Sequence, residues 1–235
     1  MMTEADTKNI YGVIRRMIAH NELPTDQKIN QVKLAEQLGV SKTPVVKALN
    51  MLAAEGLVDQ ANNVGFFVHK PSLQEVLELL LIRAGMESIA AYDIAERGDD
   101  KAIDQLAAIL DPLLQQPKDQ LNRDEYGKAD HSFHKQLMNL CDNKWLSRIN
   151  STVRVAEHPF SLGMLRELDE IQQEHAVIID ALKRHDASMA RRAAAEHILN
   201  TRKCLADAAK QFQRLGLDAS ELWMRVNVDT DKGSN

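Results

Sequence analysis

From residue 72 onward, the sequence predicts helices and no strand. Apolar residues recur there at spacings of three and four, which places them on one face of each helix. The predicted helices cover residues 72–96, 99–115, 119–142, 144–157, 166–185 and 186–214. A seventh helix is left open, because the pattern around residues 156–166 is ambiguous. Aromatic residues make up only 4% of the chain, and Ala and Leu are abundant, which favours helices over sheets. The expected fold class is mainly α.

The first seventy residues show a different pattern, with three short helices followed by two strands. Ile10, Ile14 and Ile18 share one face of the first helix, and "QVKLAEQLG" predicts the second. The third follows in "SKTPVVKALNMLAAEG", with Ser41 as its N-cap. "LVDQANNVGFFVHK" then predicts two strands around an Asn-Asn turn, the second opened by Gly65. This order is typical of a winged helix-turn-helix.

The boundary between the two parts is expected at "KPS". Pro71 interrupts the chain there, and Ser72 with Glu75 forms the pattern of a capping box. We therefore expect an N-terminal winged helix-turn-helix domain over residues 1–70 and a C-terminal all-α bundle of six or seven helices over residues 71–215. Residues 216–235 are expected to form a C-terminal tail.

The net charge of −5 conceals a difference between the two parts. Residues 1–70 carry a net charge of +1 and the remainder −6, so the acidic total says little about the partners of the first part. The longest apolar run, "LELLLI", is far shorter than the ~18 residues that a membrane span needs. The two cysteines, Cys141 and Cys204, form no CxxC pattern. We expect a cytoplasmic protein without a membrane partner or a disulfide.

The third helix has the composition of a DNA-reading helix. No acidic residue occurs between Glu36 and Glu55, whereas this window contains Lys42 and Lys47. Lysines suit phosphates, and the small polar side chains of the same helix suit base edges. A winged helix that binds another protein is the alternative. The predicted DNA-binding residues are Ser41, Lys42, Thr43, Val46, Lys47, Asn50 and Gly65.

Four polar side chains occupy positions where the helical pattern expects apolar residues. Asp130 and His134 are four apart on one helix and share a side with Phe133, while His175 and His197 lie on the apolar stripes of two later helices. An unpaired buried polar group costs roughly 2–7 kcal/mol, and one divalent cation would satisfy all four. Three imidazoles and one carboxylate suit Zn²⁺, Ni²⁺ or Mn²⁺ better than Ca²⁺ or Mg²⁺. The alternatives are hydrogen-bonded core histidines and a surface Asp–His pair.

The stretch "INQVKLAEQLGVSKTPVVKALNMLAAEGLV" and the hairpin after it resemble the DNA-binding domain of GntR-type bacterial transcription regulators, over residues 8–69. The family usually has Ser-Arg-Thr-Pro-Val-Arg-Glu-Ala-Leu where this chain has "SKTPVVKAL". Lys42 and Val46 thus replace two arginines, and Lys47 stands where Glu is usual. The resemblance implies binding to a double-stranded DNA operator, and the departures imply an operator unlike the family's common one.

The helical part resembles the FCD effector domain of the FadR-like branch, over roughly residues 72–215. That domain often carries an Asp-x-x-x-His pair and single histidines on two later helices, positions matched here by Asp130, His134, His175 and His197. The resemblance implies a metal site that small organic acids approach. Arg83 aligns with a family arginine and is the main candidate for pairing with an effector carboxylate, the alternative being an ion pair with Glu87 one turn on. The further effector-binding candidates are Tyr126, Arg154 and Asn200.

The leading functional hypothesis is a transcription regulator that acts as a homodimer and responds to a carboxylate effector. A regulator for which the metal ion itself is the signal is a variant of this hypothesis. A metal-dependent enzyme is the third hypothesis, but a hydrolase needs a carboxylate base beside the metal. Glu174 adjoins His175, and helical rotation carries it about 100° away from the metal-facing direction. We therefore expect no enzymatic activity.

Overall fold

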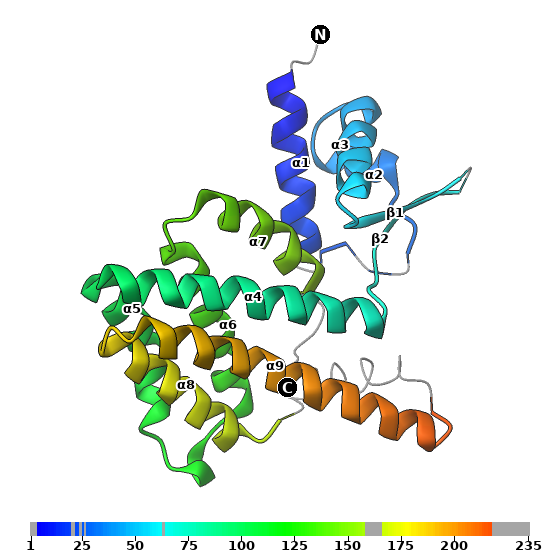
Figure 1. Cartoon of the computed structure of the whole chain (residues 1–235). Helices are drawn as coiled ribbons and strands as arrows, with labels where there is room; N and C mark the ends of the chain where they lie inside the picture. The colour runs from blue at the N-terminus through cyan, green and yellow to red at the C-terminus, as the bar shows by residue number, and fades with distance from the viewer. Residues whose placement is uncertain are drawn as a thin grey trace. The chain divides into compact units, whose positions relative to one another are not determined.

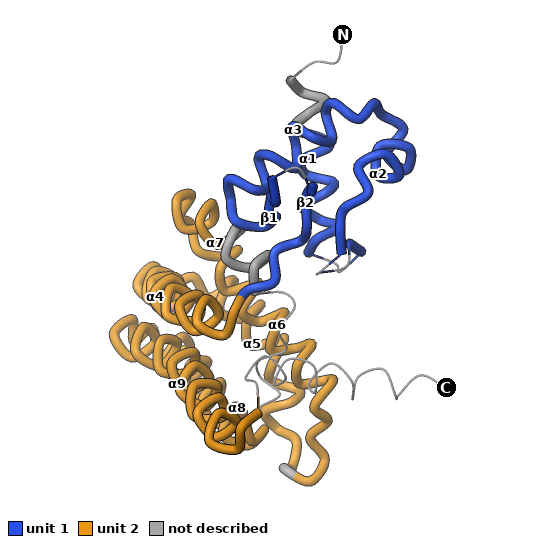
Figure 2. Tube along the Cα trace, turned by 90° about the vertical axis from the view of Figure 1, so that its right-hand side faces the viewer, with its two compact units in different colours: residues 1–71, 151–159 blue, residues 72–150, 160–235 orange. Residues whose placement is uncertain are grey.

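The structure, a computed structural model, describes residues 4–19, 22–23, 25, 27–62, 64–157 and 166–217. The chain divides into two compact units, residues 1–71 with 151–159 and residues 72–150 with 160–235 (Figure 2). Each unit contains hydrophobic clusters of its own. In the described residues the fold is mainly α with one two-stranded sheet, which confirms the predicted fold class.

The first unit contains the predicted winged helix-turn-helix. Its elements are α1 (Glu4–Ala19), α2 (Gln31–Gln37), α3 (Lys42–Ala54), β1 (Val58–Ala61) and β2 (Gly65–Val68). The two strands are antiparallel, with Val58 opposite Val68 and Ala61 opposite Gly65. α3 packs against α1 and β1, and its Val45 and Leu49 belong to one buried cluster with Ile14 and Phe66. This core holds one face of α3 and leaves the other face exposed.

Local capping explains where α2 and α3 begin. The side chain of Asn30 accepts hydrogen bonds from the backbone N–H groups of Val32 and Lys33, which satisfies two donors at the start of α2. Ser41 is the N-cap residue of α3, as predicted, but its side chain makes no capping hydrogen bond. The exposed Ser41 hydroxyl therefore does not cap the helix.

Six α-helices and one 3₁₀ turn follow residue 72 in the described part of the chain. They are α4 (Leu73–Arg97), α5 (Asp100–Leu114), η1 (Lys118–Gln120), α6 (Arg123–Leu140), α7 (Lys144–Glu157), α8 (Leu168–Lys183) and α9 (Ala187–Arg214). The prediction of one helix over 119–142 is wrong at its start. Asn122 accepts hydrogen bonds from the N–H groups of Asp124 and Glu125, so α6 begins at Arg123. Most of the ambiguous stretch at 156–166 lies outside the described residues.

α4 and α9 lie side by side and make the most extensive helix–helix contact of the described bundle (Figure 1). The predicted capping box of α4 is present, with the Ser72 side chain and the Glu75 carboxylate each satisfying a backbone N–H of the other residue. α8 packs against α9 and α5, and α6 packs against α5 and α4. The inner faces of α4, α6, α8 and α9 therefore surround a common interior.

Two further findings concern the described residues. No helix among them is long and apolar enough to cross a membrane. Both cysteines are free thiols, Cys141 buried and Cys204 half-buried.

Candidate functional site

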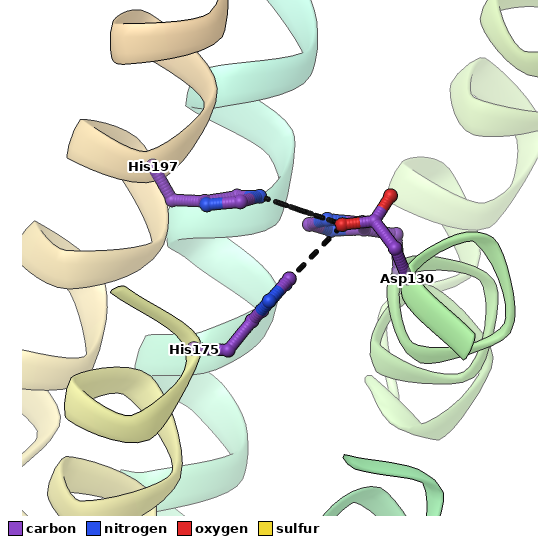
Figure 3. A group of neighbouring side chains, drawn as sticks. Asp130, His175 and His197 are labelled. Atoms are coloured by element: carbon purple, nitrogen blue, oxygen red, sulfur yellow. Dashed lines mark hydrogen bonds and ion pairs between the residues drawn. The ribbon is translucent and has the colours of Figure 1, made fainter. Parts of the chain in front are cut away.

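The four polar residues predicted to bind a metal meet inside the helical bundle. Asp130 and His134 lie one turn apart on α6, His175 lies on α8 and His197 on α9. Each offers one ligand atom, and these atoms all lie within 4.8 Å of one another. Figure 3 shows Asp130 projecting toward His175 and His197 from the opposite side of the interior. The sequence thus identified four residues that the fold brings together.

Three ring nitrogens converge on one carboxylate oxygen. Oδ1 of Asp130 lies 3.4 Å from Nε2 of His134, 3.4 Å from Nε2 of His175 and 3.9 Å from Nε2 of His197. The three histidine side chains are at most 3% exposed, whereas that of Asp130 is 24% exposed. The cluster is therefore buried on the imidazole side and reachable from solvent at the aspartate.

Apolar packing fixes the positions of the imidazole rings. Phe133, fully buried on α6, meets the rings of His134 and His175 edge-on, at centroid distances of 5.4 and 5.2 Å. The ring of His197 stacks on that of His134 with the centroids 5.0 Å apart. These contacts leave the rings little rotational freedom.

The outward-facing nitrogen of each ring also has a partner. Nδ1 of His134 lies 2.5 Å from Oε2 of Glu87 on α4, and Nδ1 of His197 lies 2.8 Å from Oε2 of Glu174 on α8. Nδ1 of His175 lies 3.0 Å from the hydroxyl of Tyr126 on α6. On the inner side, His175 Nε2 is a buried nitrogen without a hydrogen-bond partner in the described residues.

The protonation states of Asp130, His175 and His197 suit a cation. Burial raises the pKa of Asp130, but the histidines around it, above all His134, outweigh this effect and hold the pKa well below its usual range. Burial lowers the pKa of His175 and of His197, which favours the neutral form of each ring. The pKa of His134 is raised, because Glu87 and Asp130 outweigh the opposing effect of burial. The raised pKa favours the protonated form of His134, and a cation that binds to Nε2 would displace the proton from that nitrogen.

The donor set therefore fits a divalent transition metal. It offers three imidazole nitrogens and one ionised carboxylate oxygen, ligands that Zn²⁺, Ni²⁺ and Mn²⁺ accept. A bound cation would also give His175 Nε2 the partner that it lacks. An unpaired buried nitrogen of this kind costs about 1–3 kcal/mol, so filling the site would stabilise the bundle.

The predicted effector-binding residues take different places. Tyr126 is buried beside His175. Arg83 donates from Nε to Oε1 of Glu87 at 2.6 Å, the ion pair that the sequence offered as its alternative. Asn200 is exposed and donates from Nδ2 to Oε1 of Glu174 at 2.7 Å. The side chain of Arg154 lies outside the described residues.

Glu87, Glu174 and Arg166 belong to the site but were not predicted from the sequence. Glu87 carried a usable signal, because it continues the core stripe of Leu80, Ala84, Ala91 and Ile94 at spacings of three and four. It is 2% exposed. Glu174 contacts the outer nitrogen of His197, with Oε2 2.8 Å from Nδ1.

Most of the predicted DNA-binding residues lie on the exposed face of α3. Thr43, Val46, Lys47 and Asn50 recur at spacings of three and four, opposite the buried face, with Val46 half-buried and the others exposed. Ser41 and Lys42 are exposed at the N-terminal end of the same helix.

Gly65 opens β2, at the tip of the hairpin. Its φ of +141° is a backbone conformation that favours glycine, and a Cβ there would lie 2.8 Å from Cε of Lys28. The residue is thus required by the geometry of the wing.

Two family models match the chain: "Bacterial regulatory proteins, gntR family" over residues 6–68 and "FCD domain" over residues 78–200. An uncharacterized HTH-type transcriptional regulator in an unstable DNA locus of Streptomyces ambofaciens is 29% identical and aligns over 81% of this chain and 81% of its own. The probable D-xylose utilization operon transcriptional repressor of Paenarthrobacter nicotinovorans is 27% identical, over 77% of this chain and 80% of its own. The solved structure of E. coli McbR/YncC, 21% identical, covers 90% of this chain and 100% of its own with a TM-score of 0.65, which shows a common fold.

A winged helix with a lysine-bearing exposed helix, joined to a helical bundle, defines a DNA-binding transcription regulator of two parts. The chain belongs to the gntR family of bacterial regulatory proteins and carries the FCD domain of one branch of that family. The family and its relatives are transcriptional regulators and not enzymes, as the sequence analysis expected.

Removal of any of the four clustered side chains is expected to abolish tight metal binding. Asp130→Ala, His134→Ala, His175→Ala and His197→Ala should each lower the affinity for Zn²⁺, Ni²⁺ or Mn²⁺ by more than the roughly 10–100-fold typical of losing an outer partner. Elemental analysis after dialysis and titration calorimetry measure this change. His131→Ala, an exposed histidine on the same helix, is the control and should bind normally. Equal binding by all five variants would contradict the assignment.

Proposed function

We propose that this regulator binds a small organic acid at a divalent metal ion held by Asp130, His134, His175 and His197, and that this binding controls its affinity for an operator. The observation that carries the proposal is the convergence of three ring nitrogens on one carboxylate oxygen, with His175 Nε2 lacking a hydrogen-bond partner in the described residues. The ion would supply a Lewis-acidic centre with open coordination positions, since four protein ligands do not fill an octahedral shell.

The charge of the network favours an anionic effector. Its buried and half-buried charged groups are the carboxylates of Glu87, Asp130 and Glu174 and the guanidinium groups of Arg83 and Arg166. With His134 neutral, as metal binding requires, the network carries one net negative charge, which a divalent cation would change to one net positive charge. A monocarboxylate would neutralise that charge, and buried charges are stable only when paired. Asp130, the most exposed ligand, marks the side from which the acid would approach.

Two of the predicted effector-binding residues remain candidates for direct contact with the acid. Tyr126 stands beside His175, and Arg154 stays a prediction from the sequence. Arg83 and Asn200 already donate to Glu87 and Glu174.

The first part of the chain would bind DNA through the exposed face of α3. We infer that Lys42 and Lys47 contact phosphates, that Thr43 and Asn50 reach base edges, and that Val46 offers only an apolar contact such as one with a thymine methyl. The half-buried position of Val46 supports this limited role. We therefore propose that residues 1–70 bind the operator, that residues 71–215 bind the metal and the effector, and that residues 216–235 form a tail.

Loss of either lysine is expected to weaken DNA binding at all sequences alike. Lys42→Ala and Lys47→Ala should each reduce the slope of log affinity against log salt by about 1, as for one lost phosphate contact. Fluorescence anisotropy with DNA from upstream of the protein's own gene measures this slope at several salt concentrations. Lys101→Ala, which removes an exposed lysine from α5, should leave it unchanged. An unchanged slope in the α3 variants would remove these lysines from the interface.

We further propose that the regulator is a homodimer joined through the helical part. Leu81, Ile82 and Ile89 on α4 are 53%, 49% and 47% exposed. Gly85 lies between them, where an added Cβ would meet open space. Contiguous exposed apolar surface of this kind marks interaction sites, and a two-fold dimer would place two winged helices on a pseudo-palindromic operator.

Charges on this face of α4 are expected to separate the dimer. The double variant Leu81→Lys, Ile89→Lys should halve the mass measured by light scattering after gel filtration and weaken binding to a two-half-site operator. Val177→Lys, at a 43% exposed position on α8, is the matched control and should have the same measured mass as the unsubstituted protein. A double variant of unchanged mass would place the dimer contact elsewhere.

Effector binding is expected to require the metal. In a thermal-shift screen of small organic acids, a true effector at a hundred times its dissociation constant should add about 2.7 kcal/mol of stability to metal-loaded protein. The same acid should have no such effect on metal-free protein or on His197→Ala, and it should change operator affinity.

The same screen separates the alternatives. DNA affinity that follows metal concentration without any organic acid would indicate a metal-ion sensor. Equal stabilisation of metal-free and metal-loaded protein would remove the ion from effector binding.

A further inference from the structure

We propose that Glu87 and Glu174 are positioning residues of the metal site: each accepts the Nδ1 proton of one histidine and thereby directs that ring's unprotonated Nε2 toward Asp130. This inference rests on the proposed function, because it concerns how the chain prepares the site for a cation. It assigns a role to two acidic residues that lie outside the ligand set.

The two glutamates select the tautomer of each ring. A neutral imidazole carries one proton, and an ionised carboxylate can only accept a hydrogen bond. Oε2 of Glu87 lies 2.5 Å from His134 Nδ1, and Oε2 of Glu174 lies 2.8 Å from His197 Nδ1. Both contacts therefore hold the proton on Nδ1, which leaves the lone pair of each neutral ring on Nε2, the atom that faces Asp130.

This tautomer brings two unprotonated nitrogens together inside the cluster. Nε2 of His134 and Nε2 of His197 lie 3.1 Å apart. Two lone pairs at that distance repel each other unless a proton or a cation lies between them. The two glutamates thus create a position that favours positive charge.

Neighbouring donors hold the two glutamates in place. Arg83 Nε donates to Oε1 of Glu87 at 2.6 Å. Arg166 donates to both oxygens of Glu174, with Nη1 2.7 Å from Oε2, and Asn200 Nδ2 donates to Oε1 at 2.7 Å. These donors keep each carboxylate ionised and oriented. Arg83 and Asn200, expected from the sequence to touch the effector, are accordingly placed to act through the glutamates.

His175 differs from the other two ligands. Its Nδ1 faces the Tyr126 hydroxyl at 3.0 Å, and a hydroxyl can donate as well as accept. That contact does not fix the tautomer, so the carboxylates control two of the three rings.

The two glutamates are not equivalent, because only one of them meets solvent. Glu87 is 2% exposed, whereas the Glu174 side chain is 21% exposed. Glu174 lines an open groove of about 670 Å³ together with Val177, Asn200 and Cys204. Water can replace a lost acceptor at Glu174 but has little access to Glu87. Loss of Glu87 is therefore the more damaging change.

Substitution by glutamine tests the proposal, since glutamine keeps the size but can donate as well as accept and so no longer dictates the tautomer. In metal-free protein, at a pH high enough for both rings to be neutral, ¹⁵N NMR of the imidazoles should show Nδ1–H in His134 and His197. It should show a mixture of tautomers in His134 of Glu87→Gln and in His197 of Glu174→Gln. Zinc affinity from competition titration should fall roughly 10–100-fold in Glu87→Gln and less in Glu174→Gln.

Glu170→Gln is the matched control. Glu170 is 62% exposed, contacts Arg166 at 3.7 Å and lies one turn from Glu174, so its loss should change neither the tautomers nor the affinity. If buried Glu87→Gln does not fold, half-exposed Glu174→Gln still decides the matter. Unchanged tautomers and affinity in variants of a protein that binds zinc would overturn this proposal alone. A native protein that binds no Zn²⁺, Ni²⁺ or Mn²⁺ would overturn the proposed function with it.

Discussion

Three ring nitrogens buried in a helical bundle must each find a partner, and in this chain they face a single carboxylate. The network around Asp130 draws one or two polar side chains from each of α4, α6, α8 and α9: Glu87, His134, Glu174 with His175, and His197. Removing one member leaves another without its partner, which costs about 1–3 kcal/mol in a buried site. The interior of the bundle therefore cannot be altered at one helix without consequences for the other three.

That constraint gives α4 a particular importance. Its inner face holds Glu87 against His134, and its outer face carries Leu81, Ile82 and Ile89, the proposed dimer surface. Its first residue, Leu73, follows the last residue of β2 by only five positions in the chain. A ligand can shift an equilibrium only as far as it binds two arrangements unequally. In the proposed function, an acid at the metal would act on the network that contains Glu87, and hence on α4, which also carries the proposed dimer surface and begins five residues after β2.

The sequence predicted those features that depend on neighbours along the chain. Ser72 and Glu75 are three apart, so their capping box could be recognised locally, and Asp130 and His134 were marked by their place on an apolar face. Features that depend on contacts between distant segments were harder to predict. Glu174 meets His197 across 23 residues of sequence, and Arg166 follows a stretch without helical periodicity. Glu87 lay on the core stripe, but its pairing with Arg83 explained it equally well without the metal site. The early start expected for α6 had a local cause, since the N-cap role of Asn122 was not recognised.

The same contacts favour binding over catalysis in the proposed metal centre. A hydrolytic metal site needs a carboxylate that can take a proton from water beside the ion. Asp130 is itself a candidate ligand. Burial raises the pKa of Glu87, but His134 and Arg83 outweigh it and lower the pKa to about 2. Burial acts in the same direction on Glu174, and its hydrogen bonds with His197, Arg166 and Asn200 likewise lower the pKa to about 2. Both glutamates are weak bases with their oxygens engaged, and both contact the outer Nδ1 atoms of the histidines. In the proposed function, each of these three carboxylates would hold a cation or its ligands in place, as a regulator that binds and releases an acid unchanged requires.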